Sequence, residues 1–340
     1  MKEVAHLGSG NKVALVLGSG GARGYAHIGV IEALEARGYD IIAVSGCSMG
    51  ALIGGVYAAG KLPEYRDWVC HLDYFDVLKL VDVTWSPMGA MRANKVMSKL
   101  EELVGDTLIE DLLIPVTTVA TDLVRQREVW FQNGSLLQAI RASIAVPGVI
   151  TPVHVGGQVL VDGGLLNPLP MMPILAAHEA DFVVAVNVTA HSPQPITLEQ
   201  LLPSAERNDS RTALERDRAA NIGSWIDDVR ATTRRLWDEL GGSNGETGGE
   251  ASDIDETADL PGRRESGKLD MILESFDITQ AALAKYKIAG YPPDVLIEIP
   301  KTVCSAYEFH RANELIRLGR HLADEALARR MPSIASDATE

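Results

Sequence analysis

Short apolar runs alternate with helical patterns along the first half of the chain. Buried parallel strands read as nearly continuous apolar runs, and such runs are found at residues 13–17, 39–44, 114–120 and 181–188. Helical patterns lie between them at residues 25–37, 51–60 and 136–145, the last ended by Pro147. This alternation predicts an α/β fold with three layers, α/β/α, around a mostly parallel central sheet.

Two further regions carry strand patterns. Residues 153–155 and 158–161 flank the pair Gly156-Gly157, which is a signal for a two-residue hairpin turn. Towards the end of the chain, the pattern predicts a helix at 271–284, a strand within 291–299 and a closing amphipathic helix at 307–330.

Residues 46–50 read Gly-Cys-Ser-Met-Gly, a G-x-S-x-G placed where the strand 39–44 turns into a helix. Such a turn lifts a serine hydroxyl above the sheet, while glycines leave room for the bent backbone and for a substrate. The following helix directs free N–H groups to the same place. Ser48 is therefore a candidate nucleophile, and the alternative is a plain helix N-cap serine.

A second glycine cluster, residues 18–24, follows the strand 13–17. It can be a dinucleotide-binding fingerprint, an oxyanion loop that serves Ser48, or an ordinary strand-to-helix turn. The dinucleotide interpretation fits poorly, because the sixth position is Arg23 rather than glycine and Asp40 lies at the start of the second strand. The loop and Ser48 follow neighbouring parallel strands, so we interpret them as two halves of one site.

The third candidate is Asp162, which ends the predicted hairpin and precedes Gly163 and Gly164. A carboxylate there can accept the proton of a serine, although Asp-Gly pairs are also common in plain turns. The histidines that follow it, His178, His191, His310 and His321, have no recognisable catalytic surroundings and are assigned to structure or surface, as is His27 in the first helix. A carboxylate base needs a raised pKa or strong oxyanion stabilisation to act at neutral pH.

Together, residues 20–24, 46–50 and 162–164 resemble the motifs of the patatin-like phospholipases, most closely the compact bacterial members related to neuropathy target esterase. Residues 141–143, 146–148, 151–153 and 167–170 also look like that family, and the resemblance covers residues 12–190 well and 290–328 more loosely.

The resemblance implies a serine acyl hydrolase with a Ser–Asp dyad, a phospholipase A, lysophospholipase or carboxylesterase that works through an acyl-serine. By this resemblance Ser48 is the nucleophile and Asp162 the general base. The oxyanion loop comprises Gly20, Gly21, Ala22, Arg23 and Gly24, and the supporting residues are Gly46, Met49, Gly50, Gly163 and Gly164. A nucleotide-binding oxidoreductase and a catalytically idle lipid-binding regulatory module remain as alternatives.

Composition and net charge limit the classes of binding partner. The net charge of −15 argues against broad binding to nucleic acid or to an anionic bilayer. The three cysteines are scattered, the N-terminus lacks a signal-peptide core, and no metal or cofactor pattern is evident. We expect a cytoplasmic protein that acts on a lipid or acyl-ester substrate and touches the inner face of the membrane through a flap at residues 85–99.

The predicted organisation follows these signals. An N-terminal tail (1–11) precedes the patatin-like catalytic domain (12–200), which is followed by a charged helical segment (201–240) and a disordered acidic insertion (241–268). Residues 269–330 supply the strand and helices that complete the domain, and 331–340 form a tail.

Overall fold

A computed structural model describes residues 11–74, 76–77, 89–91, 93–175, 180–192, 194, 196–202 and 268–330. Its centre is a sheet in which five strands run parallel in the order β10-β9-β1-β2-β4. These strands are β1 (Lys12–Leu17), β2 (Asp40–Cys47), β4 (Val116–Asp122), β9 (Phe182–Ala190) and β10 (Val295–Pro300). Every strand predicted from an apolar run is present.

Three further strands complete the sheet around β4: they are β5 (Arg127–Phe131), β7 (Val153–Val155) and β8 (Gln158–Asp162). Strands β5 and β8 run antiparallel to β4, and β7 runs antiparallel to β8. The hairpin between β7 and β8 is confirmed, and Gly156 and Gly157 have φ angles of 54° and 72°. Two successive residues with positive φ are what a type I′ hairpin turn requires, and glycine adopts them without steric cost.

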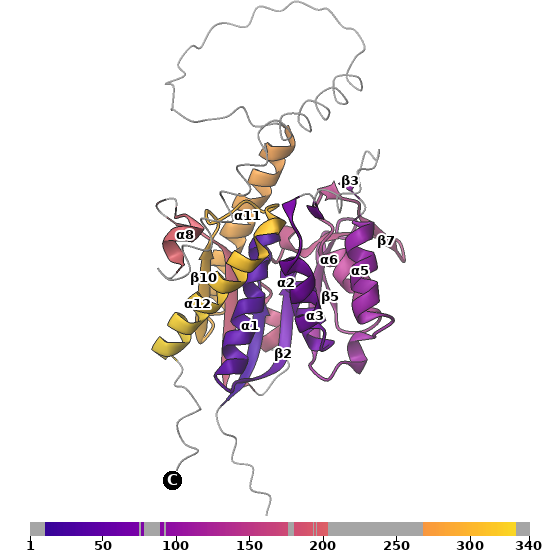
Figure 1. Cartoon of the computed structure of the whole chain (residues 1–340). Helices are drawn as coiled ribbons and strands as arrows, with labels where there is room; N and C mark the ends of the chain where they lie inside the picture. Colours follow the sequence, from indigo (N-terminus) through magenta and orange to yellow (C-terminus); the bar gives the residue numbers. More distant parts are fainter. Residues whose placement is uncertain are drawn as a thin grey trace, which may run out of the picture. The chain divides into compact units, whose positions relative to one another are not determined.

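Helices cover both faces of the sheet. In β1, Val13, Leu15 and Leu17 point into the larger core, whereas Ala14 and Val16 point into a smaller one, as the two-residue period of a strand dictates. Helices α1 and α12 lie side by side over the larger core (Figure 1). That core also receives helices α2, α3, α5 and α6, and the smaller core receives α7 and α11. The predicted three-layer α/β/α fold with a mostly parallel sheet is therefore confirmed.

The described helices have the following bounds: α1 (Ala26–Ala36), α2 (Met49–Ala58), α3 (Leu62–Cys70), α5 (Asn94–Val104), α6 (Leu136–Ser143), α7 (Met171–Leu175), α8 (Leu198–Leu201), α11 (Lys268–Gly290) and α12 (Ala312–Arg330). Short 3₁₀ helices are η1 (Gly21–Tyr25), η2 (Ile109–Asp111), η3 (Gly163–Leu165) and η4 (Phe309–Arg311). Helix α11 extends beyond the predicted range 271–284 at both ends. The closing helix, α12, begins at Ala312 and not at residue 307 as predicted.

The segment 85–99 is only partly described. Residues 89–91 form the strand β3, which pairs in parallel with β6 (Gly148–Ile150), and Asn94 begins α5. This small sheet was not predicted, because three-residue strands carry no periodic signal. Residues 85–88, which hold the predicted membrane-touching side chains of Trp85 and Met88, lie outside the described residues, so the flap stays a prediction.

Other predictions also fall outside the described residues. These concern His178, nearly all of the charged segment 201–240 and the insertion 241–268, and most of the two tails. In the part of the chain that the structure describes, no helix combines the length and apolarity needed to cross a bilayer.

Candidate active site

The register of β4 brings Ser48 and Asp162 together. Cys47, the last residue of β2, pairs with Val119 of β4, whereas Asp162, the last residue of β8, pairs with Ala120. Strand β5 pairs with Thr118–Asp122 and thus overlaps both partners, so β2 and β8 must share the opposite edge of β4. Strand β8 therefore approaches from the opposite direction and ends where β2 leaves the sheet.

The turn after β2 is sharp. Ser48 has φ 55° and ψ −119°, a conformation that costs a non-glycine residue roughly 1–3 kcal/mol and that persists where the surroundings enforce it. The flanking glycines, Gly46 and Gly50, are enclosed by backbone. A Cβ atom on Gly46 would lie 2.4 Å from the carbonyl oxygen of Gly50, and one on Gly50 would lie 2.1 Å from that of Leu17. The predicted elbow is thus present, and its two glycines occupy positions where a larger residue would clash with the backbone.

A serine from helix α6 holds this elbow. The backbone N–H of Ser48 donates to Oγ of Ser143 at 2.8 Å, and the Ser143 hydroxyl donates to the carbonyl oxygen of Val119 at 2.6 Å. Ser143 is completely buried. In the sequence, Ser143 falls within a stretch that resembles the family, and no role was predicted for it, because its function depends on which strand the end of α6 meets.

The hydroxyl of Ser48 donates to Asp162. Its Oγ lies 2.5 Å from Oδ2 of the carboxylate, and the N–H of Gly164 donates to Oδ1 at 2.7 Å. Asp162 has no solvent exposure, and Ser48 is 6% exposed. The partner of the serine hydroxyl is therefore a carboxylate rather than an imidazole.

Burial changes the pKa of this carboxylate. Removal from water disfavours the charged form and raises the pKa of Asp162 to about 6, although hydrogen bonds from Ser48, Gly164 and the Cys47 thiol act in the opposite direction. A carboxyl group with this pKa is ionised at neutral pH and is a stronger base than an ordinary aspartate. This is the raised pKa that a carboxylate base requires.

Cys47 faces the same carboxylate from the end of β2. Its Sγ lies 3.9 Å from Oδ1 of Asp162. Burial, followed by the negative charge of Asp162, raises the pKa of the Cys47 thiol. The thiol therefore stays protonated and unreactive.

The two glycines after Asp162 lie in confined space. A Cβ atom on Gly163 would lie 2.3 Å from the carbonyl oxygen of Val119. One on Gly164 would lie 2.2 Å from the side-chain nitrogen of Gln280 and 3.0 Å from Oδ1 of Asp162. Gln280 belongs to α11, so this distant helix packs directly behind the carboxylate.

The glycine loop forms the 3₁₀ helix η1 beside the elbow. A Cβ atom on Gly24 would lie 2.4 Å from Cγ of Met49, which places the loop against the residue that follows Ser48. The N–H of Ala22 donates to the carbonyl oxygen of Ala306 at 2.8 Å, so Ala22 is not free to donate to an oxyanion, contrary to the prediction.

The available donors of the loop are consequently fewer than expected. Arg23 and Gly24 lie inside η1, where 3₁₀ hydrogen bonds engage the backbone. Among the described residues, the N–H groups of Gly20 and Gly21 have no protein acceptor, as is usual at the start of a helix. Gly20 and Gly21 remain as candidate oxyanion donors.

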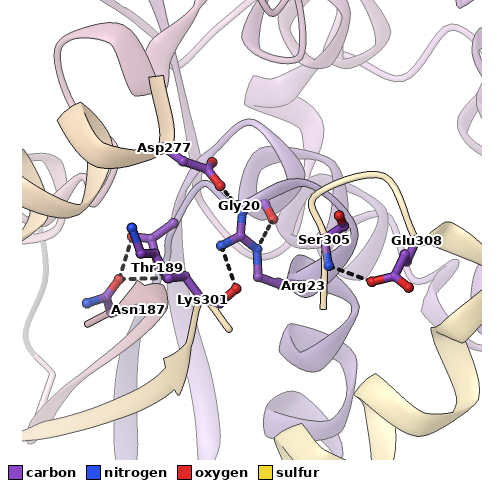
Figure 2. Close-up of polar contacts among 8 residues, drawn as sticks. All are labelled: Gly20, Arg23, Asn187, Thr189, Asp277, Lys301, Ser305 and Glu308. Carbon is purple, nitrogen blue, oxygen red and sulfur yellow. Dashed lines mark hydrogen bonds and ion pairs between the residues drawn. The ribbon is translucent and has the colours of Figure 1, made fainter. Parts of the chain in front are cut away.

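The guanidinium group of Arg23 points into the protein. Arg23 is 1% exposed, and Figure 2 shows its side chain between Gly20, Lys301 and Asp277. Its Nε donates to the carbonyl oxygen of Gly20 at 3.1 Å, Nη1 to that of Lys301 at 3.3 Å, and Nη2 to Oδ2 of Asp277 at 2.7 Å. The side chain of Arg23, the basic residue of the loop, therefore holds the loop in place.

His27 is completely buried. Its Nε2 lies 2.8 Å from the carbonyl oxygen of Gly18, and burial lowers the pKa of His27 to about 4. Because a carbonyl can only accept, the neutral ring carries its proton on Nε2. The predicted structural role of His27 fits this geometry.

The fold and the site define an α/β protein with a serine elbow, a buried aspartate and a glycine loop at one end of a parallel sheet. A model of the family "Patatin-like phospholipase" matches residues 15–175. An uncharacterised NTE family protein of Mycobacterium tuberculosis is 44% identical over 333 residues, which cover 94% of this chain and 92% of the relative. The chain therefore belongs to the NTE family and carries a patatin-like phospholipase domain.

Two more distant similarities complete the comparison. The neuropathy target esterase sws of Drosophila melanogaster is 34% identical over 200 residues, which cover 56% of this chain and 14% of the fly protein. The crystal structure of VipD from Legionella pneumophila aligns with a TM-score of 0.42 and 14% identity over 94% of this chain and 67% of VipD.

Proposed function

We propose that the chain is a serine acyl hydrolase that cleaves fatty-acyl esters of lipids through an acyl-serine intermediate. The observation that carries this proposal is the hydrogen bond of 2.5 Å from Ser48 Oγ to the buried Oδ2 of Asp162, at the end of a parallel sheet in an NTE family chain. The name of the patatin-like phospholipase family and that of the fly esterase point to the same chemistry.

The geometry supports the following first half of the reaction. Asp162 takes the proton from Ser48 Oγ while that oxygen bonds to the ester carbonyl carbon. The carbonyl oxygen becomes an oxyanion, for which the N–H groups of Gly20 and Gly21 are the proposed donors. As the intermediate collapses, the C–O bond to the alcohol breaks and protonated Asp162 gives its proton to the leaving alkoxide.

The second half repeats these steps with water. Ionised Asp162 accepts a proton from water while the water oxygen attacks the acyl carbon. The bond from the acyl carbon to Ser48 Oγ then breaks, Oγ recovers a proton from Asp162, and the fatty acid leaves. The strained elbow keeps Oγ within reach of the carboxylate throughout both halves.

The proposal is tested by hydrolysis of p-nitrophenyl acyl esters and of phospholipids by the full chain. Ser48→Ala and Asp162→Asn should each abolish turnover. The matched controls are Ser45→Ala, which removes a buried hydroxyl bonded to the carbonyl oxygen of Pro170, and Asp181→Asn, whose carboxylate accepts from the N–H of Lys12 at the other end of β1. Both controls should keep their activity.

Two outcomes would overturn the proposal. Full activity of Asp162→Asn would mean that another group is the base, and lack of turnover by the wild type on every ester would favour an idle lipid-binding module. No observation on the site favours the oxidoreductase, and saturable binding of NADH to the wild type would revive it.

A further inference from the structure

Helix α11 reaches the candidate active site although it begins 78 residues after the end of β9. It contacts the glycine loop through Asp277, the carboxylate turn through Gln280 and strand β5 through Lys287. The contact of Asp277 with Arg23 carries the inference below, which rests on the proposed function.

Arg23 fixes one peptide plane of the glycine loop. Its Nε donates to the carbonyl oxygen of Gly20, and that carbonyl belongs to the same peptide group as the N–H of Gly21. Because a trans peptide is planar, its C=O and N–H point in opposite directions. A hydrogen bond that holds the Gly20 oxygen therefore also sets the direction of the Gly21 N–H.

The other side of Gly21 is fixed as well. The N–H of Ala22 donates to the carbonyl oxygen of Ala306 at 2.8 Å, and a Cβ atom on Gly21 would lie 2.4 Å from that same oxygen. Gly21 also has φ 58°, which glycine adopts without strain. With Ala306 on one side, the other side is held at the carbonyl of Gly20, the N-cap of η1, to which the Arg23 side chain also donates.

Asp277 in turn fixes the arginine. The guanidinium of Arg23 is buried, and its single ionic partner among the described residues is Oδ2 of Asp277 at 2.7 Å, with Asp277 28% exposed (Figure 2). Its Nε and Nη1 donate to the neutral carbonyl oxygens of Gly20 and Lys301. A buried guanidinium that loses its carboxylate turns towards other acceptors or towards water, and its Nε then leaves the Gly20 oxygen.

We propose that Asp277 is a positioning residue for the oxyanion donor of the site. It acts through Arg23 and the Gly20 carbonyl to aim the N–H of Gly21, and it touches neither the substrate nor Ser48. In this arrangement, α11 couples the C-terminal part of the chain to the reaction.

The test compares Asp277→Asn and Asp277→Ser with Asp277→Glu in the full chain. Asp277→Asn and Asp277→Ser should lower kcat about tenfold, less than outright loss of an oxyanion donor, while KM changes little. Asp277→Glu should recover most of the lost rate. The matched control is Asp324→Asn, which breaks the ion pair between Asp324 and Nε of Arg37 at 3.0 Å and should leave kcat unchanged.

A second readout separates positioning from general damage. A trifluoromethyl ketone adds to the serine and forms an oxyanion, so its inhibition constant should rise by the same factor by which kcat falls. Thermal unfolding should show that the variants are folded at the assay temperature. Since Asp277 is partly exposed, water can reach the guanidinium in Asp277→Ser and keep that variant folded.

The inference is overturned if Asp277→Asn and Asp277→Ser have the same kcat as Asp324→Asn. It is also overturned if these variants change KM alone. An inhibition constant that does not change while kcat falls would also contradict it. A wild-type chain that hydrolyses no ester would instead overturn the proposed function itself.

Discussion

Cys47 and Asp162 occupy neighbouring positions along one edge of β4, one opposite Val119 and the other opposite Ala120. Parallel β2 leaves this edge after Cys47, and antiparallel β8 takes it over and ends at Asp162. The hydroxyl of Ser48 and the carboxylate of Asp162 meet because two strands of opposite direction end at the same point. The dyad geometry is thus a property of the sheet register.

The pH dependence of the reaction should report Asp162. The carboxyl acts as a base only when it is ionised, and its pKa is raised to about 6 by burial. The value of kcat/KM should therefore fall tenfold per pH unit below about 6 and level off above about 7. A pH–rate profile of ester hydrolysis measures this, and an activity that stays constant down to pH 4.5 would contradict it.

Asp162→Asn should gain stability as it loses activity. The pKa of this group is higher in the folded chain than in the unfolded one, so wild-type stability decreases as the pH rises from 3.8 to about 6. From pH 4 to pH 8, the free energy of unfolding of Asp162→Asn should rise relative to that of the wild type by about 2–3 kcal/mol. Denaturant unfolding of both proteins at the two pH values measures the change, and parallel stabilities would count against a raised pKa.

The backbone strain at Ser48 predicts a difference between two inactive variants. Glycine adopts φ 55° and ψ −119° more readily than alanine, which keeps a Cβ atom. Ser48→Gly should therefore be more stable than Ser48→Ala by about 1 kcal/mol, even though glycine increases the entropy of the unfolded chain. Equal or reversed stabilities in urea unfolding would show that the elbow is not strained.

Ser143→Ala should impair both the fold and the reaction. It leaves the Ser48 N–H and the Val119 carbonyl without the hydroxyl that joins them, at a cost of about 1–3 kcal/mol of stability. It should also slow hydrolysis about tenfold, because the elbow loses its attachment to β4. Ser45→Ala, a buried serine of β2 with one carbonyl partner, serves as the control. Loss of stability without any loss of rate would reduce Ser143 to a purely structural residue.

Local patterns in the sequence predicted the elements around the site. The apolar run at 13–17 and the Gly156-Gly157 turn were sufficient to place β1 and the β7–β8 hairpin, since both signals depend on neighbouring residues alone. Ser48 was a candidate because a G-x-S-x-G follows a strand, whereas Asp162 was paired with it only through the resemblance of the three motifs to the patatin-like phospholipases. Their actual meeting point depends on the register of β4, which no local pattern contains.

Contacts between segments that are distant in the chain could not be predicted from the sequence. Asp277 lies 254 residues from Arg23, in a helix that shows only an ordinary helical pattern. The use of the Ala22 N–H by Ala306 likewise depends on how the loop after β10 packs against η1. Tertiary packing decided which predicted donors remain available, and periodicity does not encode such packing.

The proposed reaction requires that Ser48 is a nucleophile activated by Asp162 alone. Its most direct test is the reaction of the full chain with a fluorophosphonate at pH 8, followed by peptide mass spectrometry. We expect phosphonylation at Ser48 in the wild type and in Ser45→Ala, and at least a hundredfold slower labelling in Asp162→Asn. Unchanged labelling of Ser48 in Asp162→Asn, or labelling at a different residue, would contradict it.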